Sequence, residues 1–127
     1  MRIRSLLILA SEPRVALPVT ALLALVVGIA TLTPQDHMPS APGGDKLHHF
    51  LAFGALVFPM AFARPRAAIW LVLVVSLYGA LIEVIQPHVG RHGDVMDAIA
   101  NVGGAILGAS LGAGVRRFTE RGHSEDE

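Results

Sequence analysis

Charged, imidazole and amide side chains in this chain gather beside long apolar stretches, where they could bind a ligand or transfer protons. Eight of them are candidate ligand-binding residues: Asp45, Lys46, His49, Glu83, Gln86, Arg91, Asp97 and Asn101. Ionisable groups at membrane depth are costly, and they usually line a functional site or pair with one another. Lys46 can bind an anionic group as a point charge, and Arg91 can bind it with two parallel hydrogen bonds. The side chains of Glu83, Asp97 and Asn101 would orient these two cations.

Helical spacing places these residues on shared faces. Glu83 and Gln86 are three positions apart, and Asp97 and Asn101 are four apart, so each pair lies on one face of a helix. Small residues continue the second face at intervals of four, and they are Gly104, Gly108 and Gly112. Such a stripe lets membrane helices approach closely, which predicts that it packs against a neighbouring helix.

A purely structural role is the alternative for the same carboxylates. Glu83 or Asp97 would then pair with Lys46 or Arg91 and clamp three helices together, and we expect Arg91 or His49 to reach Glu83. Asp94 and Asp97 also suit the start of a helix, where a carboxylate accepts hydrogen bonds from free backbone N–H groups.

Metal and cofactor binding have little support in the sequence. His48 and His49 stand beside Asp45, but no HExxH or similar ligand spacing surrounds them. The chain has no cysteine, which excludes thiolate ligands and disulfides. The sequence therefore predicts no metal site and identifies no cofactor.

The elements that must position these side chains are membrane helices. Of the 127 residues, 53% are hydrophobic and only 16% are charged, whereas soluble domains carry about 25% charged residues. Four apolar stretches, at residues 15–33, 47–63, 67–85 and 95–115, approach the ~20 residues that span a bilayer. The second is short and contains Pro59. We predict an all-α, polytopic membrane protein, a four-transmembrane-helix bundle.

Positive charges give the predicted orientation and domain boundaries. Eight of the ten basic residues would lie on one side: Arg2, Arg4, Arg14, Arg64, Arg66, Arg116, Arg117 and Arg121. Lys46 and Arg91 would lie on the other. Because short cytoplasmic loops are rich in Lys and Arg, we expect a multi-pass protein of the cell membrane with cytoplasmic termini. Residues 1–14 form a cytoplasmic N-terminal segment, 15–115 the membrane domain with an uncleaved first span, and 116–127 a cytoplasmic polar tail that we expect to fray.

The sequence resembles the VanZ-like family, small membrane proteins named for a teicoplanin-resistance component. Five matching pieces occur in family order: Asp45-Lys46-x-x-His49-Phe50 with Ala52-Phe53-Gly54, Tyr78-Gly79 with Glu83-x-x-Gln86, Gly90-Arg91, Asp97-x-x-x-Asn101, and Gly104-x-x-x-Gly108. They cover about half of the chain. The resemblance implies a multi-helix membrane fold and a role in envelope or glycopeptide-antibiotic biology, and it implies no particular reaction.

Three functions fit these observations. The first is an outward-facing polar pocket that binds or acts on an envelope lipid or its headgroup, with an anionic lipid as the partner within the bilayer. The second is an enzyme in which His49 and Glu83 act as acid and base on a lipid-linked phosphate or sugar. The third is an assembly partner that docks through its glycine stripe. The formal net charge is zero, so bulk binding to nucleic acid is not expected.

Overall fold

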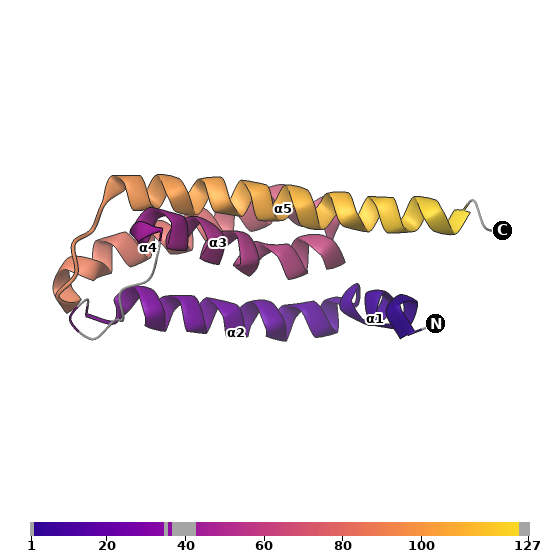
Figure 1. The fold of residues 1–127 in the computed structure, drawn as a ribbon, viewed down its shortest axis with the longest axis horizontal. Coiled ribbons are helices and arrows are strands. Elements are labelled where there is room, and N and C mark those ends of the chain that lie inside the picture. Colours follow the sequence, from indigo (N-terminus) through magenta and orange to yellow (C-terminus); the bar gives the residue numbers. More distant parts are fainter. Residues whose placement is uncertain (1, 35, 37–42, 125–127) are drawn as a thin grey trace.

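The computed structural model describes residues 2–34, 36 and 43–124, and this part of the chain contains helices and no strand (Figure 1). The helices are α1 (Arg2–Ala10), α2 (Pro13–Leu32), α3 (Gly44–Ala63), α4 (Ala68–Ile85) and α5 (Val95–Ser124), with short 3-10 helices η2 (Pro65–Ala67) and η3 (Gln86–Val89) on either side of α4. Four segments within the described ranges are long and apolar enough to cross a membrane: Pro13–Leu32, Gly44–Ala63, Pro65–Val89 and Val95–Gly122. The predicted all-α, four-transmembrane-helix fold is confirmed.

The outer surface of the bundle is apolar over most of its length. Leu22 on α2 is 61% exposed and Leu77 on α4 is 73% exposed. Only 17% of the spanning windows of these two helices are buried inside the protein. In water such a surface would be strongly unfavourable, so it identifies lipid as the surrounding solvent.

The bundle is organised around α3, which packs most extensively against α5 and also contacts α2 (Figure 1). The α4 helix packs chiefly on α5. Phe53, Leu56 and Val57 of α3 meet Ala105 and Ala109 of α5 in the buried core. Pro59 lies inside α3 without ending it, and the helix spans 20 residues. Membrane helices tolerate such a proline when the surrounding protein satisfies the freed backbone groups.

The glycine stripe of α5 lies directly against the backbone of α3. A Cβ atom added at Gly104 would overlap the carbonyl oxygen of Phe50, and one at Gly108 would overlap that of Gly54. At Gly112 the added atom would lie 2.7 Å from the carbonyl oxygen of Phe58. The stripe is therefore occupied within the chain, which removes it as a free docking face for another protein.

The C-terminal end of the chain differs from the sequence expectation. The N-terminal segment contains a helix, α1, and α5 continues through Ser124 where fraying was expected after residue 115. The Arg116 side chain donates to the Glu120 carboxylate over 2.7 Å, an i,i+4 pair that extends the helix beyond its apolar part. Residues 125–127 of the predicted tail, and 35 and 37–42 of the first connection, lie outside the described residues.

Both described ends of the chain lie at the same end of the bundle (Figure 1). The end of α2 and the start of α3 lie at the opposite end, and so does the connection from α4 to α5. This connection turns at Gly90, whose φ of 76° favours glycine because it has no Cβ. The candidate site residues are therefore carried to the end of the bundle away from the termini.

Candidate functional site

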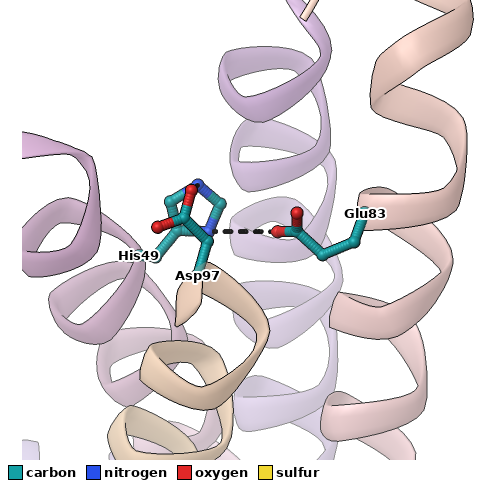
Figure 2. Close-up of side chains that lie close together, drawn as sticks. All are labelled: His49, Glu83 and Asp97. Carbon is teal, nitrogen blue, oxygen red and sulfur yellow. Dashed lines mark ion pairs between the residues drawn. The ribbon is translucent and has the colours of Figure 1, made fainter. Parts of the chain in front are cut away.

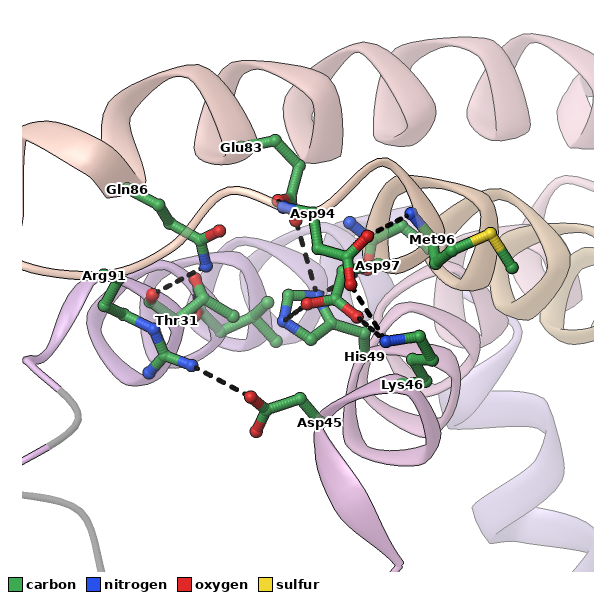
Figure 3. A network of polar contacts seen from close by, with 12 residues as sticks. Thr31, Asp45, Lys46, His49, Glu83, Gln86, Arg91, Asp94, Met96 and Asp97 are labelled. Atoms are coloured by element: carbon green, nitrogen blue, oxygen red, sulfur yellow. Dashed lines mark hydrogen bonds and ion pairs between the residues drawn. The ribbon is translucent and has the colours of Figure 1, made fainter.

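The candidate residues come together at this end as one polar network, drawn in Figure 3. The start of α3, the end of α4 with η3, and the start of α5 all contribute. We call the following set the polar end cluster: Asp45, Lys46, His49, Glu83, Gln86, Arg91, Asp94, Asp97 and Asn101. Eight of its members are the residues selected from the sequence, and Asp94 is the ninth. The cluster has a buried centre, an exposed rim and a part that faces α2.

His49 occupies the buried centre and is only 4% exposed. Its Nδ1 atom lies 2.8 Å from Oδ1 of Asn101, a fully buried residue on α5. The same Nδ1 lies 3.9 Å from Oε1 of Glu83, and Nε2 lies 3.9 Å from Oδ2 of Asp97 (Figure 2). One imidazole ring from α3 thus stands between a carboxylate of α4 and a carboxylate of α5.

Lys46 forms the rim with Asp94. Its Nζ atom lies 2.9 Å from Oδ2 of Asp94 and 3.6 Å from Oδ1 of Asp97, and its side chain is 56% exposed. Oδ1 of Asp94 accepts a hydrogen bond from the backbone N–H of Met96, which makes Asp94 the N-cap of α5. The hydrogen bond from Lys46, followed by that from Met96, lowers the pKa of the Asp94 carboxyl. Of the two carboxylates expected at this helix start, Asp94 caps it and Asp97 turns into the bundle.

Glu83 is held in place by the chain that leads into α5. The backbone N–H of Asp94 donates to Oε2 of Glu83 over 2.9 Å. A Cβ atom at Gly93 would lie 2.7 Å from the carbonyl oxygen of Glu83, so glycine lets this segment approach α4 closely. His49 is the partner that reaches Glu83 at 3.9 Å, as the sequence led us to expect for His49 or Arg91.

Gln86 and Arg91 face α2 and not the buried centre (Figure 3). Nε2 of Gln86 donates to the carbonyl oxygen of Thr31 over 3.0 Å, and a guanidinium N–H of Arg91 donates to that of Thr33 over 3.1 Å. The last carbonyl groups of a helix lack intrahelical partners, so these contacts satisfy the end of α2. Arg91 also lies 3.9 Å from the carboxylate of Asp45. The contacts of Gln86 and Arg91 with α2 did not follow from sequence spacing.

Several buried polar atoms of the polar end cluster have no hydrogen-bond partner among the residues that the structure describes. They are Oε1 of Glu83, Oε1 of Gln86, Oδ1 of Asp97 and Nδ2 of Asn101. Three of the four are lone-pair acceptors. The great majority of buried polar groups in proteins are paired, so an unpaired group calls for a water molecule, a ligand or an ion. The four unpaired atoms are therefore mainly suited to accept hydrogen bonds or to bind a cation.

The sequence predicted no metal site, and it did not connect Glu83 and Asp97 with a histidine as ligands. In the described part of the chain these two residues and His49 each offer one ligand atom, and the three atoms lie within 4.8 Å of one another. The trio joins residues from three helices, so no spacing along the sequence could have revealed it.

Fold and cluster together define a polytopic α-helical membrane protein with a buried polar centre at one end of its bundle. The family model of VanZ/LLP1 matches residues 7–116, which is most of the chain, and the protein belongs to this family. The VanZ-like resemblance seen in the sequence is thereby confirmed. No curated protein and no solved structure matches the chain in the corresponding comparisons.

Proposed function

We propose that the polar end cluster binds the headgroup of an anionic envelope lipid at the outer face of the cell membrane. The observation that carries this proposal is the set of buried, unpaired polar atoms beneath a rim of exposed charges. The predominance of basic residues at the other end supports an outward orientation of the cluster, because cytoplasmic segments retain Lys and Arg.

The rim provides contacts for the phosphate. Lys46 is more than half exposed and is within reach of a headgroup. Arg91 lies outside the rim, against α2, with a side chain that is 9% exposed; it donates one N–H to Thr33, and its 3.9 Å separation from Asp45 is longer than a hydrogen bond. A guanidinium has five N–H donors, so Arg91 keeps donors for a phosphate oxygen.

The buried centre supports a headgroup that also carries hydroxyl or ammonium groups. Oε1 of Glu83 and Oδ1 of Asp97 require a donor, whereas Nδ2 of Asn101 requires an acceptor. A bare phosphate would meet two carboxylates here and be repelled. A phospholipid with a hydroxylated or amine headgroup supplies both kinds of partner.

Native mass spectrometry of protein extracted from its own membrane tests this proposal. We expect one class of anionic lipid to stay bound, and Lys46→Gln to reduce its retention. Arg117→Gln is the matched control, because it removes a cation at the opposite end of the bundle and should leave retention unchanged. Equal retention in both variants and the original protein would contradict the proposal.

An enzyme acting on a lipid-linked phosphate or sugar is the second candidate. The observation that favours it is the position of His49 between the carboxylates of Glu83 and Asp97, an arrangement suited to proton transfer. Incubation with membrane lipids separates the two candidates, since an enzyme changes the mass of the lipid and a binding protein returns it unchanged.

A further inference from the structure

We infer that His49, Glu83 and Asp97 form a binding site for one divalent transition-metal ion. The three side chains come from α3, α4 and α5 and offer ligand atoms within 4.8 Å of one another (Figure 2). Asp97 and His49 are buried, and the side chain of Glu83 is 11% exposed. This inference goes beyond lipid binding and does not depend on it, and it gives to a metal ion the same two carboxylates that the proposed function pairs with headgroup donors.

The charge balance of the trio favours a cation. The carboxylates of Glu83 and Asp97 lie at the edge of the apolar bundle. Lys46, which is hydrogen-bonded to Asp94, lies 3.6 Å from Oδ1 of Asp97 without a hydrogen bond to it. Glu83 accepts a hydrogen bond from the backbone N–H group of Asp94, but that group carries no full charge and does not neutralise the carboxylate. Buried carboxylates need compensating charge, and one divalent ion would serve both.

Each carboxylate of the trio has one unpaired oxygen within the described part of the chain. Oε1 of Glu83 and Oδ1 of Asp97 are buried, have no hydrogen-bond partner, and belong to the trio. Carboxylate oxygens are ligands for divalent ions in proteins. An ion held by the trio would bind Oε1 of Glu83, and it would bind Asp97 through Oδ2, which faces Nε2 of His49, or through Oδ1, which lies 3.6 Å from Lys46.

Asn101 orients the imidazole for ligation. Nδ1 of His49 lies 2.8 Å from Oδ1 of Asn101, and because an amide oxygen can only accept, this contact is a hydrogen bond in the tautomer that carries the proton on Nδ1. When the ring is neutral, this leaves the lone pair on Nε2, the atom 3.9 Å from Oδ2 of Asp97. A ligating histidine usually donates its other N–H to such an oxygen.

The donor set identifies the class of metal. One imidazole nitrogen and two carboxylate oxygens suit Zn²⁺ or Mn²⁺ and leave an open position for water or a phosphate oxygen. Bonds of about 2.0–2.2 Å place neighbouring ligand atoms about 3.3–3.6 Å apart in a tetrahedron. The 3.9 Å separation of Nε2 and Oδ2 is close to this range, and the three side chains, whose ligand atoms lie within 4.8 Å of one another, would move together on binding.

Metal binding by the full chain in detergent tests this inference. Protein stripped with a chelator is equilibrated with buffered Zn²⁺ or Mn²⁺, and the bound metal is counted by elemental analysis. We expect one equivalent per chain and a loss of affinity of at least about tenfold in Asp97→Asn and in Glu83→Gln. His48→Gln, one position away on the same helix, is the matched control and should bind normally. Less than a tenth of an equivalent in the original protein, or unchanged binding in both carboxylate variants, would overturn the inference.

A second measurement on the original protein covers the case in which the variants do not fold. X-ray absorption at the zinc edge should show only nitrogen and oxygen ligands with a single imidazole. Two or more imidazole ligands would place the metal on other histidines and refute the site. Lipid retention after chelation separates this inference from the proposed function, because lipid that stays on a chain unable to bind metal supports lipid binding alone.

Discussion

The Nζ atom of Lys46 lies 2.9 Å from Oδ2 of Asp94, and this contact joins the first turn of α3 to the N-cap of α5. The two helices thereby meet at the same end as the buried carboxylates. Both side chains are substantially exposed, so the ion pair itself adds little to stability. Its main effect is to fix the start of α5 and with it the position of Asp97.

The first prediction concerns the acidity of Asp94. The hydrogen bond from Lys46 lowers the pKa of this carboxyl below its ordinary value of 3.8. Any stabilisation from the charged carboxylate is therefore fully present above pH 3.8 and is lost as the pH falls through the lowered pKa. In Lys46→Met the pKa should rise toward 3.8, measured by a carboxyl carbon NMR titration in micelles.

The control for this titration is Arg66→Met, which removes a cation between the second and third spans. It should leave the pKa of Asp94 where it is in the original protein. An Asp94 pKa that does not move in Lys46→Met would show that the contact is not formed in solution.

The second prediction concerns the close contact of α5 with α3. Gly108→Ala places a Cβ atom against the carbonyl oxygen of Gly54, and a backbone atom cannot rotate away. We expect a loss of about 1–3 kcal/mol and a lower melting temperature in detergent. Gly114→Ala is the matched control, because nothing lies within 4 Å of its added atom. Alanine favours helix over glycine, so this control should melt at the same temperature or higher. Equal losses in the two variants would contradict the close contact.

Much of this architecture could be predicted from the sequence because two signals are strong. Apolar length predicts membrane helices, and the separation of Asp97 from Asn101 by four residues places them on one face. The candidate polar residues lie at the ends of the predicted spans on one side of the membrane, so the sequence also predicts that they gather at one end of the bundle. Whether these residues bind a ligand stays a prediction.

The partner of each face could not be predicted, because it depends on how the helices are arranged around one another. Gln86 shares a face with Glu83, yet Gln86 contacts the end of α2 while Glu83 contacts His49. Gln86 and Arg91 donate to the main-chain carbonyl oxygens of Thr31 and Thr33. Every residue has such a carbonyl group, so the sequence does not indicate which ones accept these hydrogen bonds. For the same reason the sequence did not associate His49 with Glu83 and Asp97 as metal ligands.

The third prediction concerns orientation in the membrane. The chain has no native cysteine, so single cysteines can be labelled selectively with an impermeant reagent. His88→Cys, at the polar end of the bundle, should react in intact cells, whereas Pro65→Cys and Gly122→Cys should react only after lysis. Ser40, a further outer position expected from the sequence, lies outside the described residues. Labelling of Pro65→Cys in intact cells would reverse the assigned orientation.

The last prediction separates the part of the polar end cluster that clamps α2 from the part that binds a ligand. Gln86 is 1% exposed and donates to Thr31, so Gln86→Ala removes a hydrogen bond and leaves a cavity. We expect it to cost about 2–4 kcal/mol of stability. Glu83→Gln keeps the size of the side chain and an oxygen that can still accept the N–H of Asp94, but it removes the charge. Its melting temperature in detergent should stay near that of the original protein, while lipid retention falls about tenfold, equivalent to about 1.4 kcal/mol of binding. If instead Glu83→Gln unfolds the protein and the remaining folded fraction retains lipid normally, Glu83 is a structural clamp, since breaking a buried charged contact costs stability through the group left behind.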